Sequence, residues 1–353
     1  MWGARITTST ILLTLASVAS AQWVPQQSGT NAEFRGLVAT SASVVWASGT
    51  RGRVARTTDG GATWSVDSVP GASAGGLDFR AIAPRTDRLA WVMSAGPAEN
   101  GQAQIFRTTD GTSWAKQYTT AQTGVFLDAI AFWDDRHGIA MSDPVGGKLF
   151  ILVTDDGERW SQVPTDAAPA VLPGEAAFAA SGTCLFVRGS SNVWIGTGGG
   201  ARARVFRSSD RGRTWQVADT PLHAGNSASG IFSIAFNDDR HGVAVGGEYS
   251  KPKEEFDNVA VTDDGGATWR RAHGPLPRGY MSAVAFVPGS RGRQLVAVGL
   301  GGTARSDDAG ESWTMVDTVA YNSITFAPNG DGWAAGPRGR IAKWSPTSAP
   351  KKP

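Results

Sequence analysis

Cysteine, histidine and tyrosine are scarce in this chain of 353 residues, which contains one, four and four of them. A lone cysteine, Cys184, excludes an internal disulfide. Because it lies in the apolar run 184–187, we expect a buried, inert thiol rather than a nucleophile. His137 and His241 occupy the same Asp-Asp-Arg-His-Gly turn of two different repeats, and the other two histidines are isolated. The sequence therefore predicts no metal centre and no cofactor.

An excess of charge is missing as well. The 33 basic and 31 acidic side chains leave a formal net charge of +2. Proteins that bind nucleic acid usually concentrate positive charge on one face, and neither the net charge nor any run of basic residues suggests this here. We therefore expect no nucleic-acid partner.

Long apolar runs are absent, and the short one near the N-terminus resembles a targeting signal. Arg5 precedes an apolar core at 11–18, and Ala-Ser-Ala at 19–21 fits a signal-peptidase site. The core is too short to span a bilayer comfortably, and no cysteine stands at the cleavage site to carry a lipid. We predict a signal peptide over 1–21, an exported protein that is periplasmic or secreted, and no stable membrane insertion.

Glycine (45) and tryptophan (14) are abundant, and an eight-residue motif recurs. Residues 57–64 read Thr-Thr-Asp-Gly-Gly-Ala-Thr-Trp, and further full-length copies start at 208, 262 and 306. Copies one residue shorter start at 108 and 154. We call this pattern, Ser/Thr-x-Asp-x-Gly-x-Thr-Trp, the clamp motif. Its aspartates and tryptophans are Asp59, Trp64, Asp110, Trp114, Asp156, Trp160, Asp210, Trp215, Asp264, Trp269, Asp308 and Trp313.

Each clamp motif predicts a structural hairpin turn. A short carboxylate accepts hydrogen bonds from backbone N–H groups of the turn, and glycine supplies the positive φ. The tryptophan opens the next strand and can bury its ring between neighbouring sheets. A calcium loop of the EF-hand type would need alternating ligands and a closing glutamate, which the motif lacks. We therefore expect the motif to be structural and to bind no metal.

Two further pieces recur before the clamp motifs. One is an apolar strand, such as 231–236, and the other is a strand that ends in a small residue, such as 242–246. With a strand leading into the clamp motif and another leaving it, the repeat is a four-stranded antiparallel sheet. The second strand occurs seven times, although only six units carry a clamp motif. Self-similarity at this period indicates a repeat array.

The two ends of the array complement each other. The last unit ends at 344 without a fourth strand, whereas residues 22–27 resemble a fourth strand with no unit before it. Closure of the ring by this N-terminal strand would protect the sheet edges. We predict an all-β fold, a seven-bladed β-propeller over 22–344, followed by a disordered tail over 345–353.

Two units are irregular. In the fourth, residues 178–181 are expected to replace the usual first strand, after a long proline-containing connection at 165–175. In the fifth, residues 248–258 form the largest insertion, between the second and third strands. Loops longer than the repeat requires are common places for function.

The clamp motif is similar to the Asp-box, or BNR, repeat of sialidases and related propellers. The longer period, such as 234–247 followed by the clamp motif at 262–269, resembles the photosystem II stability/assembly factor family over essentially the whole mature chain. The resemblance implies a propeller scaffold and, from the second family, a non-catalytic role in binding or assembling a protein partner. The Asp-box itself is shared by hydrolases and binding proteins and does not decide activity.

The candidate site is the channel mouth on the face opposite the clamp motifs, where the loops joining successive units gather. Its charges are mixed in sign, which suits the recognition of a peptide or a carboxylate. The candidate binding residues on this loop face are Arg35, Arg51, Arg80, Asp128, Asp143, Glu175, Glu248, Tyr249, Tyr280, Asn322 and Arg338.

Three functions stay open at this point. The sequence favours an exported, monomeric propeller that binds a protein or peptide, with a glycan as a further ligand class. A sialidase-like glycoside hydrolase would need converging arginines, for which Arg35, Arg80 and Arg338 are available. It would also need a Tyr/Glu pair, either Tyr280 or Tyr249 with Glu248, but no Arg-Ile-Pro segment is present. An oxidoreductase with a cofactor in the channel is third, because the glycine-rich stretches at 196–201 and 299–304 lead into hairpins and not helices.

Overall fold

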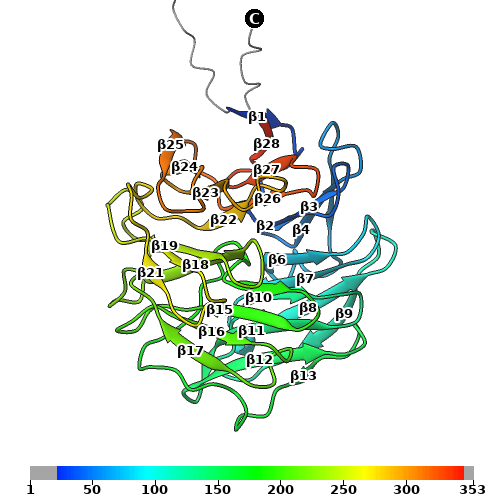
Figure 1. Cartoon of the computed structure of the whole chain (residues 1–353). Coiled ribbons are helices and arrows are strands. Elements are labelled where there is room, and N and C mark those ends of the chain that lie inside the picture. The colour runs from blue at the N-terminus through cyan, green and yellow to red at the C-terminus, as the bar shows by residue number, and fades with distance from the viewer. Residues whose placement is uncertain (1–21, 346–353) are drawn as a thin grey trace, which may run out of the picture.

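The computed structural model describes residues 22–345, which form a ring of seven four-stranded antiparallel sheets (Figure 1). The predicted all-β, seven-bladed propeller is confirmed. A single 3-10 turn, η1 (Ala98–Asn100), is the only helical element among these residues. The signal peptide predicted over 1–21 and residues 346–353 of the predicted tail lie outside the described residues. Ser345, expected to begin the tail, is the last residue of β28.

In blades one to six the strands follow one another in sequence from the channel outward, and the first strands of neighbouring blades pack against one another around the whole ring. Blade one consists of β2 (Phe34–Ala39), β3 (Val45–Gly49), β4 (Arg53–Thr57) and β5 (Ser65–Ser68). Blade two consists of β6 (Asp78–Pro84), β7 (Ala90–Ala95), β8 (Gln104–Thr108) and β9 (Ala115–Thr119). Blade three consists of β10 (Leu127–Phe132), β11 (Gly138–Val145), β12 (Lys148–Thr154) and β13 (Ser161–Gln162). Blade four consists of β14 (Leu185–Arg188), β15 (Asn192–Gly196), β16 (Arg204–Ser208) and β17 (Gln216–Asp219). Blade five consists of β18 (Ser229–Phe236), β19 (Gly242–Glu248), β20 (Val259–Thr262) and β21 (Arg270–Arg271). Blade six consists of β22 (Ala283–Phe286), β23 (Leu295–Gly299), β24 (Gly302–Ser306) and β25 (Thr314–Asp317).

Blade seven joins the two ends of the chain, as predicted. Its strands are β26 (Ser323–Phe326), β27 (Gly332–Ala335), β28 (Ile341–Ser345) and, outermost, β1 (Gln22–Gln26). In the antiparallel register Trp23 lies opposite Trp344, with ring centroids 4.8 Å apart. Trp23 also donates from Nε1 to Thr303 Oγ1 of blade six at 2.9 Å. The N-terminal strand therefore closes the ring.

The clamp motif at 57–64 shows how local hydrogen bonds shape the turn. Thr57 Oγ1 accepts from the Gly61 N–H at 2.9 Å, and Gly61 has the positive φ of 89° that the turn requires. Asp59 accepts from the Thr63 backbone N–H at 2.9 Å and from the Thr63 hydroxyl at 2.6 Å. Hydrogen bonds from the Thr63 hydroxyl, the Thr63 N–H and the Thr57 hydroxyl lower the pKa of Asp59 to about 2. The aspartate is thus held by its own turn.

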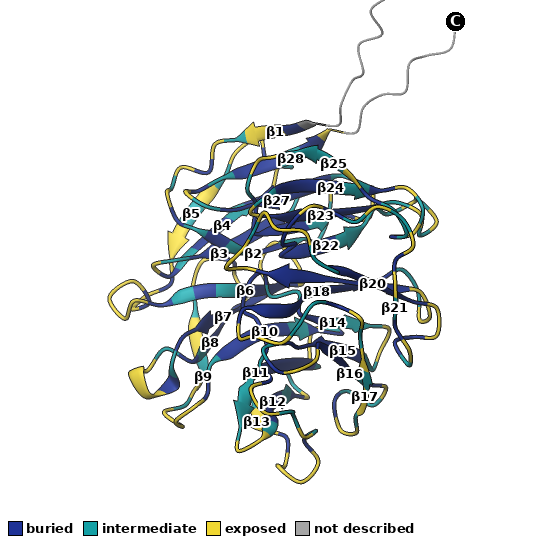
Figure 2. Ribbon diagram, turned by 90° about the vertical axis from the view of Figure 1, so that its left-hand side faces the viewer, coloured by how far each residue is buried: buried dark blue, intermediate teal, exposed yellow. Residues whose placement is uncertain are grey.

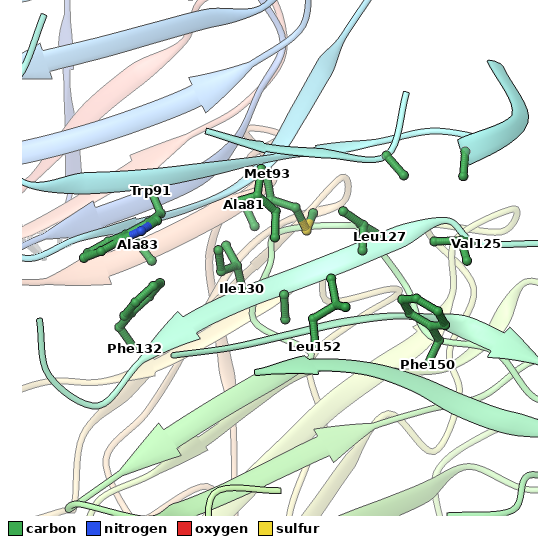
Figure 3. Packing of buried hydrophobic residues seen from close by; sticks show 14 residues of the cluster. Ala81, Ala83, Trp91, Met93, Val125, Leu127, Ile130, Phe132, Phe150 and Leu152 are labelled. Carbon is green, nitrogen blue, oxygen red and sulfur yellow. The ribbon is translucent and has the colours of Figure 1, made fainter. Parts of the chain in front are cut away.

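An apolar cluster fills each of the seven junctions between blades. Figure 3 shows the cluster between blades two and three, where Trp91 stacks on Phe132 with centroids 3.8 Å apart and Met93 is fully buried. Trp160, from the clamp motif of blade three, packs against the same cluster. The outer strands β5 and β9 are largely exposed (Figure 2). Tryptophans of the clamp motifs thus seal each blade against its predecessor, and Trp23 has this role in blade seven.

Blade four departs from the sequence prediction. Residues 178–181 do not form its first strand, which is β14 (Leu185–Arg188) and follows the buried Cys184. Residues 178–183, which we call the crossing segment, instead contact the inner strands of other blades. Ser181 Oγ donates to the Ser282 carbonyl of blade six at 2.8 Å, and Thr183 Oγ1 donates to Ser233 Oγ of blade five at 2.8 Å. A segment with partners on several sides of the ring must lie within the channel, which is why it is unavailable as a strand.

Candidate binding site at the loop face of the channel

A cavity of about 380 Å³ lies at the loop-face end of the channel, and the crossing segment forms part of its wall. A second cavity, of about 290 Å³, is lined by Ser181, Gly182 and Thr183 and by the clamp-face ends of the inner strands. The crossing segment therefore contributes to both cavities. The loop-face cavity is lined by Glu33, Arg35, Arg80, Phe126, Asp128, Asp143, Ala177, Phe178, Ala179, Ala180, Phe232, Tyr249, Tyr280, Leu300 and Asn322.

A repeated β-bulge supplies four of these lining side chains. The register between the first and second strands shifts by one residue at Arg35, Arg80, Asp128 and Phe232 in blades one, two, three and five. A bulge leaves one residue unpaired and turns its side chain away from the regular alternation. In the sequence, each of these four residues directly follows a buried aromatic or aliphatic residue. This spacing could have identified Phe232, which the sequence prediction missed.

The two arginines occupy neighbouring blades, and each has a carboxylate of its own. Arg35 Nη2 lies 2.6 Å from Glu33 Oε1, and Arg35 Nη1 donates to the Ala180 carbonyl at 3.3 Å. Arg80 Nε lies 2.8 Å from Asp78 Oδ2. Both pairs are partly exposed. The arginines are therefore each positioned by an ion pair within their own blade.

Two other carboxylates lie in the same cavity without an ion-pair partner. Asp128 is 1% exposed, and its Oδ2 has no hydrogen-bond partner within residues 22–345. Asp143 Oδ1 accepts from the Ala177 N–H at 3.1 Å. Burial, followed by the neighbouring charge of Asp143, raises the pKa of Asp128 well above its ordinary value, although Arg80 opposes the shift. Burial also raises the pKa of Asp143 to about 6.

Aromatic side chains form the side of the cavity that belongs to blades five and six. Phe178 of the crossing segment stacks on Phe232 with centroids 4.0 Å apart. Tyr249, from the insertion between β19 and β20, lies edge-on to both rings, and Tyr280 lies edge-on to Phe232 at 4.6 Å. Burial raises the pKa of Tyr280, so its hydroxyl stays neutral at physiological pH. Phe178 and Phe126 were not predicted as site residues from the sequence, because phenylalanines in a strand-rich chain are usually core.

Seven of the eleven candidate binding residues line this cavity, and four lie elsewhere. Arg51 and Arg338 are exposed in hairpin turns, both with positive φ, and neither lines the cavity. Glu175 is buried and pairs with Arg204, whose Nε lies 3.0 Å from Glu175 Oε1. Glu248 accepts from Ser250 Oγ at 2.8 Å and lies 3.1 Å from His223 Nε2. These bonds, with that from Ser250 the strongest, lower the pKa of Glu248 to about 2.

The arrangement lacks the contacts that a sialidase-like hydrolase would need. The hydrolase hypothesis pairs Tyr280 or Tyr249 with Glu248, but the hydrogen-bond partners of Glu248 among the described residues are Ser250, His223 and Asn226. Arg338 borders a different surface hollow, near β1 and β28, and does not join Arg35 and Arg80. The three arginines and the Tyr/Glu pair proposed from the sequence are therefore not brought together.

Residues 22–345 contain no group of three or more His, Cys, Asp or Glu side chains placed to hold a metal ion. None of their helical segments has the length and apolar character needed to cross a bilayer.

No protein-family model and no curated protein matches the sequence. Among solved structures, the chain is similar to one described as YCF48 bound to D1 peptide, with a TM-score of 0.66, 17% identity, and coverage of 94% of this chain and 100% of that one. YCF48 from Cyanidioschyzon merolae matches with a TM-score of 0.61, 18% identity, and coverage of 94% and 100%. A GH74 xyloglucanase from Xanthomonas campestris matches with a TM-score of 0.63 and 17% identity, covering 94% of this chain but 55% of the enzyme. The chain thus shares its seven-bladed fold with YCF48, a photosystem II assembly factor, and with a propeller of a glycoside hydrolase.

Proposed function

We propose that the protein is an exported, non-catalytic propeller that binds an extended peptide segment of a protein partner in the loop-face cavity. The observation that carries this proposal is the composition of the cavity wall. Arg35 and Arg80 offer hydrogen-bond donors on one side, and Phe178 and Phe232 offer apolar faces on the other. A few fixed polar groups around an apolar hollow are typical of ligand sites.

Two further points support a peptide rather than a folded surface. The cavity is concave and small, so it suits one or two side chains of a partner. A structure that shares the fold is described as YCF48 bound to D1 peptide. Neighbouring arginines recognise carboxylates, so an acidic side chain or a C-terminal carboxylate of the peptide is expected on the Arg35 and Arg80 side.

The binding proposal is tested with a library of displayed random peptides. Selected peptides should bind the wild-type protein in calorimetry, and Arg80→Ala should weaken binding about tenfold or more, since one hydrogen bond to a charged group contributes about 1.5–3 kcal/mol. Arg338→Ala is the matched control, because Arg338 is an exposed arginine outside the cavity. A library that yields no binder, or binders equally affected by both substitutions, would contradict the proposal.

Two assays address export and catalysis. Edman sequencing of protein recovered from fractionated cells should start at Gln22, in the exported fraction. Incubation with xyloglucan, sialosides and aryl glycosides should give no turnover. Hydrolysis that persists on purification and disappears in Asp143→Asn would establish an enzyme instead.

A further inference from the structure

Asp128 is the one cavity residue whose burial is not explained by its surroundings. It is 1% exposed, it lines the loop-face cavity, and its Oδ2 has no hydrogen-bond partner within residues 22–345. Buried polar groups in proteins nearly always have a partner, because leaving one unpaired is costly. The unpaired oxygen therefore suggests that a ligand provides the missing donor.

Asp143 adds a second carboxylate at the same end of the cavity. It lies on β11 in blade three, as Asp128 lies on β10, and its charge acts directly on Asp128. The backbone N–H groups of Ala177 and Ala179 hydrogen-bond to Asp143 and Asp128 respectively. The backbone of residues 177–179 therefore lies against both carboxylates, and Phe178, between the two alanines, lines the same cavity.

The two arginines of the cavity form their ion pairs with other carboxylates. Arg35 pairs with Glu33, and Arg80 pairs with Asp78. Neither Asp128 nor Asp143 forms an ion pair with another described residue. The corner therefore has an excess of acceptors for a cation, and the aromatic side chains of Phe178 and Tyr249 line the same cavity.

Carboxylates beside aromatic faces are suited to an organic cation. A lysine ammonium or an arginine guanidinium donates hydrogen bonds to carboxylates and is attracted to the face of an aromatic ring. A hydrated divalent metal would make no use of the aromatic faces, and the described residues offer no third acidic or histidine ligand here. Tyr249 is 49% exposed, so it can adjust to a side chain that enters from outside.

We propose that the corner formed by Asp128, Asp143 and Phe178 binds one cationic side chain, a lysine or an arginine, of the peptide that occupies the loop-face cavity. This inference rests on the proposed function. The cavity then has two sites of opposite charge. Arg35 and Arg80 provide donors for a carboxylate, and Asp128 and Asp143 provide acceptors for a cation. The preferred peptide thus carries an acidic and a basic group close together.

The proposal implies that binding is coupled to proton release. The charged and titratable groups facing Asp128 are Asp143 on β11, Arg80 on β6 and the Cys184 thiol before β14. Burial raises the pKa values of both carboxyls, and Asp143 reaches about 6. A cation favours the ionised carboxylates, so it binds more tightly as the pH rises through this range.

The test uses Nα-acetyl-lysine methylamide and its arginine analogue, with Nα-acetyl-norleucine methylamide as the uncharged control. Saturation-transfer NMR and calorimetry should detect the two cations but not the norleucine compound. Binding should be at least about tenfold weaker at about pH 5 than at about pH 8, because both carboxyls are more protonated at the lower pH. Calorimetry in buffers of different ionisation enthalpy should show proton release.

Three variants locate the site. Asp128→Asn and Asp143→Asn should each weaken binding of the cations by about tenfold or more, as expected for loss of one charge partner. Both replace a carboxyl with an amide of nearly the same shape, so melting curves should show intact folding. Asp67→Asn is the matched control, because Asp67 is exposed on the outer strand β5. Tyr249→Leu should weaken binding through loss of the aromatic face.

The outcomes separate this inference from the proposed function. Equal binding of the lysine and norleucine compounds, or cation binding unchanged in Asp128→Asn, would overturn the cationic site even where library peptides still bind. Binding of calcium in place of the lysine compound would overturn it as well. If the lysine compound binds as expected but no library peptide does, the cationic site stands and the peptide-binding function fails.

Discussion

Removal of the Trp23 side chain is expected to weaken the ring at the junction between blades six and seven. Trp23 is 8% exposed and lies on β1, which completes blade seven. Its ring packs against Trp344 at 4.8 Å and Tyr321 at 5.4 Å, and its Nε1 donates to the fully buried Thr303 hydroxyl. Trp23→Ala therefore removes the aromatic contacts with Trp344 and Tyr321 together with the hydrogen bond to blade six, at the junction between blades six and seven.

The expected loss in free energy of unfolding follows from these contacts. Truncating a buried tryptophan to alanine costs about 3–5 kcal/mol in free energy of unfolding. The loss of the hydrogen bond to Thr303 adds about 1 kcal/mol, so the total is about 4–6 kcal/mol. Val24→Ala, on the same strand, is the matched control, because Val24 is 52% exposed and should change stability by no more than about 0.5 kcal/mol.

Urea unfolding followed by circular dichroism distinguishes the two variants. The midpoint of Trp23→Ala should fall well below that of Val24→Ala at an unchanged slope, because the slope reports the surface exposed on unfolding. A chain that lacks residues 22–27 should be less stable still and should aggregate in light scattering, since the edge of β28 is left open. Equal midpoints for Trp23→Ala and Val24→Ala would refute the reasoning that β1 closes the ring.

Three further predictions concern local interactions. Thr57→Val leaves the buried Gly61 N–H without its acceptor and should lower the free energy of unfolding by about 1–3 kcal/mol, measured by chemical unfolding. An effect of the same substitution on peptide binding would argue against a structural role for the clamp motif. Arg204→Met leaves the buried Glu175 carboxylate unpaired and should cost about 3–5 kcal/mol at neutral pH; a melting temperature equal to wild type would show that Glu175 does not depend on Arg204. Asp143 has a raised pKa of about 6, so the folded state binds more protons than the unfolded state between about pH 4 and about pH 6, and stability should fall as the pH rises through this window. Asp143→Asn should flatten that fall, and an unaltered pH profile would contradict the burial of this carboxyl.

Much of the architecture could be predicted from the sequence because the interactions that specify it are local. In the clamp motif, Thr57, Asp59, Gly61 and Thr63 satisfy one another within seven residues of chain. Strand alternation and the small residues that end the second strands act over equally short distances. The second strand recurs seven times and the clamp motif six times, which leaves one unit without a fourth strand, and the N-terminal Trp23 segment supplies that strand.

The site could be predicted only in part. The repeat placed Arg35 and Arg80 at equivalent positions of adjacent blades, so symmetry alone made them neighbours. Arg338 was assigned to the loop face by the same argument, but it lies in a hairpin turn outside the cavity. Glu175 was proposed as a binding residue, and its environment depends on Arg204, which is 29 residues away in the chain.

The amino-acid sequence by itself determined the number of blades, their strand order and the closure of the ring, because turn chemistry and side-chain alternation are short-range. Only the tertiary structure decided what occupies the channel. The crossing segment loses its strand by bonding to blades that lie far from it in sequence, and Phe178 meets Phe232 only because the ring brings them together. The raised pKa of Asp128 likewise arises from burial and from Asp143, which depend on the folded chain as a whole.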